Sequence, residues 1–135
     1  MRFVITEFFQ TNARQLCSSC FVFNPLTGKS VHARAIWDTG AAQSCISPAI
    51  AAELGLPVVT SIISNTANGK TKANIYAVDI AIGNIRFPKI DVSSPPLAEE
   101  DLVLIGMDII GMGKFTVQNT DVNGVLKKVL TLELP

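Results

Sequence analysis

The sequence has few charged side chains and no excess of either sign. Charged residues make up 16% of its 135 residues, and 11 Lys and Arg balance 11 Asp and Glu. A basic surface that would attract nucleic acid or an anionic membrane is therefore not expected. No apolar run approaches the about 18 residues that suggest a transmembrane helix. We predict neither a nucleic-acid partner nor a membrane partner.

Cysteine and histidine are also scarce. Three Cys are an odd number, which argues against a disulfide framework and favours a reducing, cytoplasmic compartment. Cys17 and Cys20 have the spacing of half a zinc site, but the remaining candidates, Cys45 and His32, are unsuitably spaced. A redox pair would normally open a helix in a βαβ unit, which the pattern lacks. We expect ordinary thiols, a surface His32, no Ser-His-Asp centre, and no metal or cofactor.

Apolar residues, in contrast, are plentiful. They make up 48% of the sequence, and a chain of this length can bury a core in one domain without disulfides. We predict a single domain over residues 1–135, with an N-terminal strand and connection over 1–20 and the core over 21–135. A small apolar domain without net charge often buries part of its surface in an oligomer, which favours a dimer.

Alternating apolar segments separated by turn signals predict about eight short strands. They are expected at 4–9, 21–23, 31–37, 75–82, 85–92, 102–105, 115–119 and 125–134. Pro57 begins a further extended segment, and Pro88 indicates an edge strand or a bulge. Asn68-Gly69 gives the strongest hairpin signal in the chain. The pattern predicts a small all-β, closed barrel-like fold.

Two short helices are expected between the strands. Ser47 followed by Pro48 has the chemistry of a helix start, and Gly55 that of a helix end. Residues 107–112 are long enough for one or two further turns. Asp108 is expected to bond local backbone N–H groups at the start of this second helix. Three other acidic residues are expected to be solvated: Asp79, Asp91 and Asp101.

The segment that best indicates a catalytic site is Asp38-Thr39-Gly40-Ala41, which follows the apolar run Ala35-Ile36-Trp37. One way to stabilise a carboxylate there is to pair it with its copy from a second chain. Two carboxyls in contact cannot both ionise, so the pair supplies an acid and a base side by side. Gly40 lets the backbone turn sharply. The alternative is a plain turn, since Asp-Thr-Gly is good turn chemistry.

With its surrounding segments, this motif resembles the retroviral-type aspartic proteases, the retropepsins, and their bacterial single-domain relatives. Residues 35–41 look like the catalytic strand and loop of that family. Residues 102–110, an apolar strand leading into Gly106 and a helix, look like its second signature. The Asn68-Gly69 hairpin falls where the family has the flap that closes over substrate. The likeness extends in order from about Phe21 to Leu134.

The resemblance implies an acid protease fold with one lobe per chain, and a homodimer that hydrolyses peptide bonds of a polypeptide substrate. It implies that Asp38 and its symmetry mate share a proton and activate a water. The implied catalytic residues are Asp38, Thr39 and Gly40; the implied substrate-binding residues are Ala41, Ala42, Ala67, Asn68, Gly69 and Ile105. In the family the chain ends interleave between subunits, which points to Phe3–Phe9 and Val129–Leu134.

Two further hypotheses remain open beside the endopeptidase. A catalytically weak or inactive module on the same fold would dimerise and only hold a peptide. A domain excised from a polyprotein is less expected, because the chain has its own Met1 and a full set of elements. In several retroviral enzymes an acidic residue and an Arg form an ion pair where this chain has Ala42 and Met107. We expect an apolar contact in its place.

Overall fold

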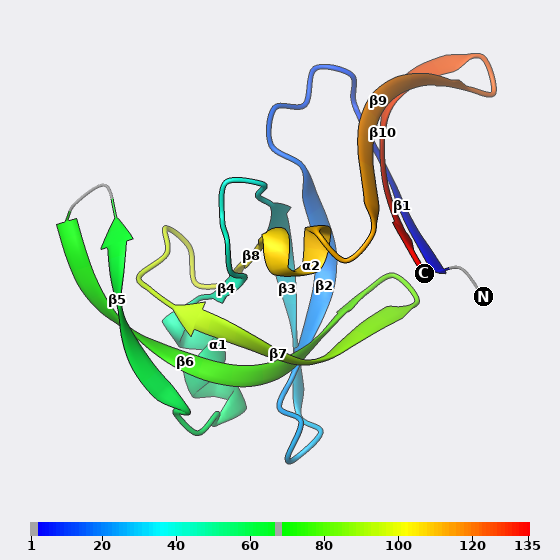
Figure 1. The fold of residues 1–135 in the computed structure, drawn as a ribbon. Helices are drawn as coiled ribbons and strands as arrows, with labels where there is room; N and C mark the ends of the chain where they lie inside the picture. The colour runs from blue at the N-terminus through cyan, green and yellow to red at the C-terminus, as the bar shows by residue number, and fades with distance from the viewer. Residues whose placement is uncertain (1–2, 67–68) are drawn as a thin grey trace.

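Strands dominate the computed structural model, which describes residues 3–66 and 69–135 (Figure 1). All eight predicted strand ranges contain strands, β5 starts at Thr60 rather than Pro57, and β4 is a strand that the pattern does not predict. In the described ranges the elements are β1 (Phe3–Phe9), β2 (Cys17–Phe23), β3 (Ser30–Trp37), β4 (Cys45–Ile46), α1 (Pro48–Leu54), β5 (Thr60–Thr66), β6 (Gly69–Ile82), β7 (Ile85–Ser94), β8 (Leu102–Ile105), α2 (Met107–Ile110), β9 (Lys114–Val122) and β10 (Val125–Leu134).

Six of these strands close into a barrel. The order of pairing is β2-β3-β8-β4-β7-β6, and β6 pairs back onto β2. Closure removes the free edges of the sheet, which is how small all-β folds avoid unpaired backbone groups. β8 lies between β3 and β4, and Val103 and Ile105 have no exposed surface. The predictions of a small closed all-β fold and of a strand over 102–105 are confirmed.

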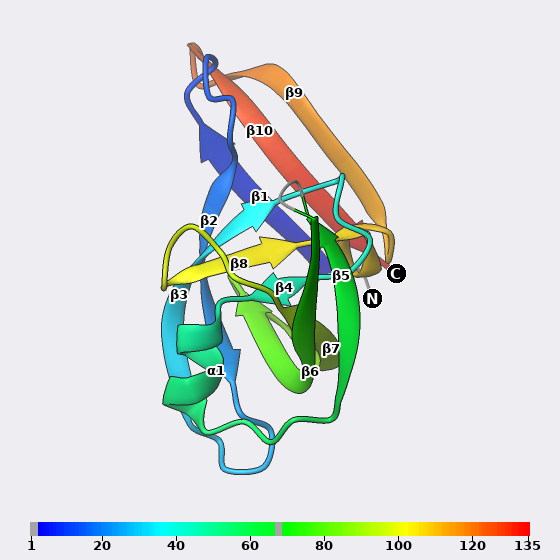
Figure 2. The ribbon, with the colours of Figure 1, turned by 90° about the vertical axis from the view of Figure 1, so that its left-hand side faces the viewer.

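Helix α1 begins and ends at the predicted residues and lies beside β3 (Figure 2). The Ser47 hydroxyl accepts a hydrogen bond from the Ile50 N–H, and Pro48 occupies the first turn. Gly55 ends the helix in the left-handed conformation, with φ 62°. The helix buries Ile50 and Leu54 against the barrel and covers one side of the core.

Pro88 lies at a break in the β6–β7 register, as predicted. The next residue, Lys89, has φ 53°, and its N–H donates to Asp79 Oδ1 at 2.9 Å. Arg86 also donates to Asp79, from Nε to Oδ2 at 3.0 Å. The prediction that Asp79 is solvated is wrong: the residue is only 9% exposed because the bulge and Arg86 together satisfy its carboxylate. The other two carboxylates are exposed as expected: Asp91 and Asp101.

The chain ends form a separate three-stranded sheet, ordered β1-β10-β9, which we call the arm. It stands beside the barrel and extends past one end of it (Figure 1). Ile5, Leu130 and Leu132 anchor the arm in the core, whereas Leu126 is 59% exposed, although alternation places it on the same face as Leu130 and Leu132. β10 has a neighbour on each side within the chain. Val129–Leu134 is therefore a strand as expected, but both of its edges are already paired. Among the described strands of the arm, β1 and β9 are the two with an edge open to a second subunit.

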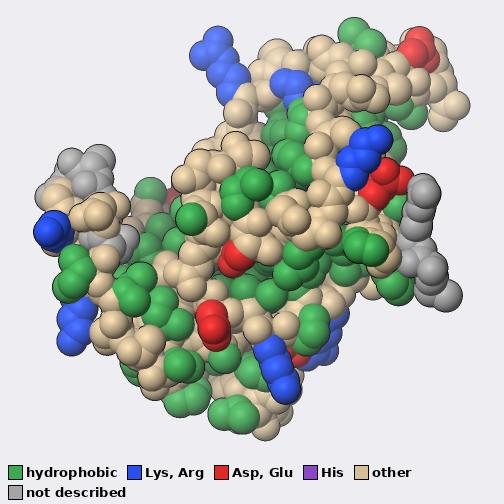
Figure 3. All heavy atoms as spheres, in the orientation of Figure 1, with side chains coloured by type: hydrophobic (Ala, Val, Ile, Leu, Met, Phe, Trp, Pro, Cys, Tyr) green, Lys and Arg blue, Asp and Glu red, His purple; other side chains and the backbone are tan. Residues whose placement is uncertain are grey.

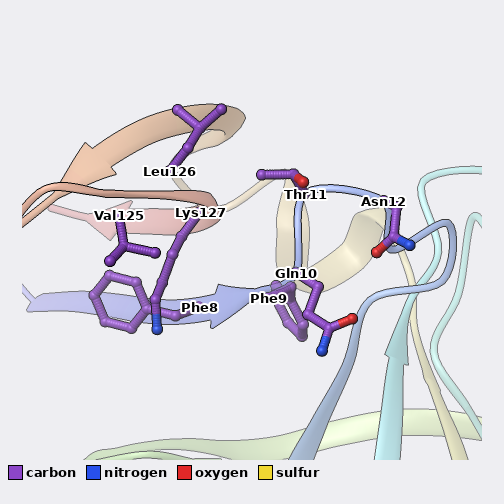
Figure 4. A pocket seen from close by; sticks show the side chains of 8 residues that line it. All are labelled: Phe8, Phe9, Gln10, Thr11, Asn12, Val125, Leu126 and Lys127. Atoms are coloured by element: carbon purple, nitrogen blue, oxygen red, sulfur yellow. The ribbon is translucent and has the colours of Figure 1, made fainter.

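A pocket of about 560 Å³ lies at the far tip of the arm, where β1 ends and β10 begins. Figure 4 shows Phe8, Val125 and Lys127 gathered on one side, with Leu126 pointing away from them. Phe8 and Val125 are each more than half exposed. The tip of the arm thus carries apolar surface that the barrel does not cover.

The β5–β6 hairpin projects on the opposite side of the barrel from the arm (Figure 1). Thr66 is opposite Gly69 in the pairing, which confirms the hairpin predicted from Asn68-Gly69. The first residues of β6 pair only with β5, and β7 joins from Asn74 onward. Ala67 and Asn68, two of the predicted flap residues, lie outside the described residues.

Candidate active site

Asp38 directly follows β3, next to a pocket that it shares with β9 of the arm. Its backbone N–H donates to the Ile105 carbonyl of β8 at 2.8 Å. Its carboxylate Oδ1 accepts the Gly40 N–H at 2.9 Å, and its carbonyl accepts the Ala41 N–H at 3.2 Å. The motif is thus a tight turn, as the turn hypothesis requires. The Asp38 carboxylate is nevertheless half-buried and has one oxygen, Oδ2, that is not used by the turn.

A pocket of about 430 Å³ opens directly beside Asp38, between the motif, the connection from β1 to β2, and the arm. Its apolar wall includes Trp37 and Phe115, whose ring centres are 5.8 Å apart. Trp37 is fixed further by its indole N–H, which donates to Ser18 Oγ at 2.8 Å. Among the described residues, the pocket is lined by Arg14, Gln15, Leu16, Ile36, Trp37, Asp38, Thr39, Phe115 and Val117. Asp38 is the one carboxylate in this set.

The loop after the motif lies directly on the junction between β8 and α2. The Met107 N–H donates to the Ala41 carbonyl at 2.7 Å. A Cβ atom at Gly106 would lie 2.7 Å from the Ala41 oxygen and 2.8 Å from the Gln43 carbonyl carbon, so only hydrogen fits there. The two sequence motifs, separated by more than sixty residues, are therefore in backbone contact.

The structure separates the predicted site residues into three groups. Asp38 to Ala42 lie together on the loop, with Ala41 half-buried and Ala42 exposed. Ile105 is buried with no exposed surface, so its side chain belongs to the core and cannot line a cleft in the subunit. It contributes its backbone carbonyl to Asp38 instead. Gly69 is exposed on the hairpin, and Ala67 and Asn68 lie outside the described residues.

Ser44 and Asp108 form a polar connection that sequence reasoning missed. The Ser44 N–H donates to Asp108 Oδ2 at 3.0 Å, and the Ser44 hydroxyl donates to Oδ1 at 2.7 Å. Asp108 also accepts the local Ile109 N–H at 2.9 Å, as predicted. The loop and the helix are thus joined by polar contacts at Ser44 and Asp108, and Met107 is 43% exposed.

Cys45 lies next to this connection on β4. Its Sγ is 3.1 Å from Ser93 Oγ. Burial raises the pKa of the Cys45 thiol, the Ser93 hydrogen bond opposes this, and the Asp108 and Asp38 carboxylates raise the pKa further. A thiol held protonated is a poor nucleophile. Within the described residues no group of three His, Cys, Asp or Glu side chains is arranged to hold a metal ion, and no helix is long and apolar enough to cross a membrane.

Comparisons with known proteins identify the family. The chain matches the family model described as gag-polyprotein putative aspartyl protease over residues 26–112. It is similar in structure to a retropepsin-like aspartic protease from Rickettsia conorii, with 20% identity, a TM-score of 0.64, and coverage of 100% of this chain and 97% of that chain. It is also similar to Simian Foamy Virus (mac) protease, with 14% identity, a TM-score of 0.50, and coverage of 71% and 92%. No curated protein sequence matches.

These comparisons agree with the geometry around Asp38. The two structural likenesses have low identity and show the fold alone. The family match is independent of them and covers well over half of the chain, including the Asp38 loop and the β8–α2 junction but not β1, β9 or β10. The chain belongs to the retropepsin-like aspartic proteases, in the family described as gag-polyprotein putative aspartyl protease.

Proposed function

We propose that two copies of the chain form an aspartic endopeptidase, with Asp38 of each copy in a shared site. The observation that carries this proposal is that half-buried Asp38, on a turn fixed by β8, is the one carboxylate among the described residues that line the open pocket. One carboxylate supplies only one of the two protonation states that amide hydrolysis needs. The second carboxylate must then come from another chain.

In the proposed mechanism the two Asp38 carboxyls share one proton. The ionised carboxylate accepts a proton from a water held between them, and that water attacks the scissile carbonyl. The protonated carboxyl donates to the carbonyl oxygen, which gives a tetrahedral intermediate. The carboxyl that took the proton from the water then donates it to the amide nitrogen as the C–N bond breaks. Gly40, whose N–H holds Asp38 Oδ1, keeps the carboxylate oriented during the exchange.

Cleavage of a peptide library by the purified chain tests this function. Because one carboxyl of the pair must be ionised and the other protonated, activity is expected to peak on the acid side of neutral within about pH 3 to 8. A statine-type transition-state mimic is expected to inhibit it. The absence of cleavage throughout this range, at chain concentrations where the protein is dimeric, would contradict the proposal.

A peptide-binding module on the same fold is the second candidate. The observation that favours it is the lack of the charged pair at Ala42 and Met107, which changes the polar groups offered to a substrate backbone. Such a module would bind library peptides without cutting them. Its binding would survive replacement of Asp38, because it does not use a shared proton.

The dimer proposal makes a prediction for Val117. This residue of β9 is 41% exposed and lines the same pocket as Asp38 and Thr39. If two Asp38 side chains meet across a two-fold axis, Val117 lies close to that axis and is covered in the dimer. Val117→Lys would bury a charge there and is expected to weaken dimerisation at least about tenfold, because an unpaired charge at an interface is costly. Sedimentation equilibrium measures the change.

The matched control is Leu26→Lys. Leu26 is 77% exposed in the turn between β2 and β3, at the end of β3 remote from Asp38. This variant is expected to dimerise and cleave like the wild type. Cleavage by Val117→Lys should return at high chain concentration, because the defect is in association. Wild-type association of Val117→Lys would place the interface elsewhere.

A further inference from the structure

We propose that Asp108 is a positioning residue for Asp38, acting through Ser44; this rests on the proposed function. Asp108 lies in α2 and Ser44 just after the Asp38 loop, 64 residues away in sequence. Both carboxylate oxygens of Asp108 are used, by the Ser44 N–H, the Ser44 hydroxyl and the Ile109 N–H. The Asp108 carboxylate thus accepts three hydrogen bonds and has no ion-pair partner among the described residues. Its role is therefore that of a hydrogen-bond acceptor.

Ser44 uses all of its polar groups to join four elements. Its side chain has no exposed surface, and its hydroxyl accepts the Gly106 N–H at 3.0 Å while donating to Asp108. Its carbonyl accepts the Ser93 N–H of β7 at 3.2 Å. The loop, α2, the β8–α2 junction and β7 therefore meet at one buried serine. Buried networks of this kind are rigid when every member is satisfied.

This network fixes the end of the loop that carries Asp38. The start of the loop is held by the Asp38 N–H on the Ile105 carbonyl, and the middle by the Ala41 carbonyl on Met107. Ser44 and Asp108 hold the remaining end. A loop fixed at three points leaves Asp38 little freedom, and catalysis is sensitive to displacements of about 1 Å in reacting groups.

Asp108→Asn tests the role without changing the volume of the side chain. An amide has one acceptor oxygen, and in either orientation its NH₂ faces a backbone N–H, of Ser44 or of Ile109. We expect kcat to fall by about tenfold with KM changed less than about threefold, because the chemical step depends on where Asp38 lies. Ser44→Ala breaks the same network, so the double variant is expected to lose less than the product of the two single effects.

Asp101→Asn is the matched control. Asp101 immediately precedes β8, whereas Asp108 follows that strand closely. Like Asp108, Asp101 accepts a hydrogen bond from a residue distant in sequence, from Arg34 Nε to its Oδ2 at 2.8 Å. It lies at the opposite end of β8 from the Asp38 loop, so its kcat should equal that of the wild type. A wild-type kcat for Asp108→Asn, or a kcat reduced only in proportion to the folded fraction, would overturn the proposal.

Amide hydrogen exchange tests the positioning role of Asp108 without measuring cleavage. The Gly40 N–H is held by the Asp38 carboxylate, so its exchange rate reports how well Asp38 is held. Exchange at Gly40 and Ser44 is expected to be faster in Asp108→Asn than in the wild type or Asp101→Asn. If the wild type cleaves nothing, the proposed function fails, and Gly40 exchange decides the positioning role by itself. Unchanged exchange at Gly40 rejects the role.

Discussion

Asp38→Asn is expected to lower the rate of cleavage at least about a thousandfold while leaving the fold and the dimer intact. An asparagine cannot take a proton from water, and it cannot share one with its counterpart. Its amide oxygen can still accept the Gly40 N–H that Asp38 Oδ1 accepts now, so the turn is preserved. The measurements are peptide cleavage at the optimal pH, thermal unfolding, and sedimentation of each protein.

Mixed dimers make this test specific for a shared site. When wild type and Asp38→Asn are mixed in equal amounts and allowed to exchange, about one quarter of the dimers carry two Asp38 residues. Cleavage per wild-type chain is therefore expected to fall to about half. A chain that acts alone would keep its full activity in the mixture. Residual cleavage by Asp38→Asn equal to that of the wild type would show that another group performs the reaction.

Local signals were sufficient for most of the barrel. Helix α1 is specified by local residues: Ser47 and Gly55 each satisfy a backbone group within four residues, and Pro48 occupies the first turn, where no N–H is needed. The bulge at Pro88 follows from its missing N–H. In contrast, β4 has two residues, which is too short to show alternation, and its pairing depends on neighbours supplied by β7 and β8.

The local geometry at Asp38 follows from consecutive residues, whereas the contacts that hold the loop come from distant parts of the chain. Asp38 to Gly40 are adjacent in sequence, and the turn they form is visible in the motif. The Ser44–Asp108 connection joins residues far apart, and nothing near either residue indicates the other. Ile105 was placed among the substrate-binding residues by the family resemblance. The continuous apolar run around it has no alternation that would have shown its side chain to face the core.

The arm shows the same limit for strand pairing. Alternating apolar strands at both chain ends indicate that each needs a partner, but not whether the partner is in the same chain. The structure pairs β1 with β10 inside the chain. Removing Thr131 to Pro135, a test suggested by the family's interleaved ends, would therefore delete buried Leu132 and damage the subunit itself. A surface substitution such as Val117→Lys is the cleaner test of association.

Gly106→Ala is expected to lower cleavage by about a hundredfold, because an added methyl displaces the loop that carries Asp38. The backbone of Gly106, with φ −95° and ψ −172°, is open to any residue, so the backbone conformation does not require glycine. The contacts do require it, since the new Cβ would lie 2.7 Å from the Ala41 oxygen. The Ala41 oxygen and the Gln43 carbonyl carbon, which lies 2.8 Å from the new Cβ, are backbone atoms and cannot rotate away. The loop itself must therefore move, which costs about 1–3 kcal/mol of stability.

Gly124→Ala separates loss of stability from loss of position. Gly124 lies in the β9–β10 turn with φ 83°, and no atom lies within 4 Å of its ideal Cβ. The left-handed backbone makes alanine there cost about 1–2 kcal/mol, similar to Gly106→Ala, without a contact near Asp38. Cleavage per folded molecule should be unchanged in Gly124→Ala and greatly reduced in Gly106→Ala. Equal activity in the two folded variants would mean that the distance between Gly106 and the loop does not determine where Asp38 lies.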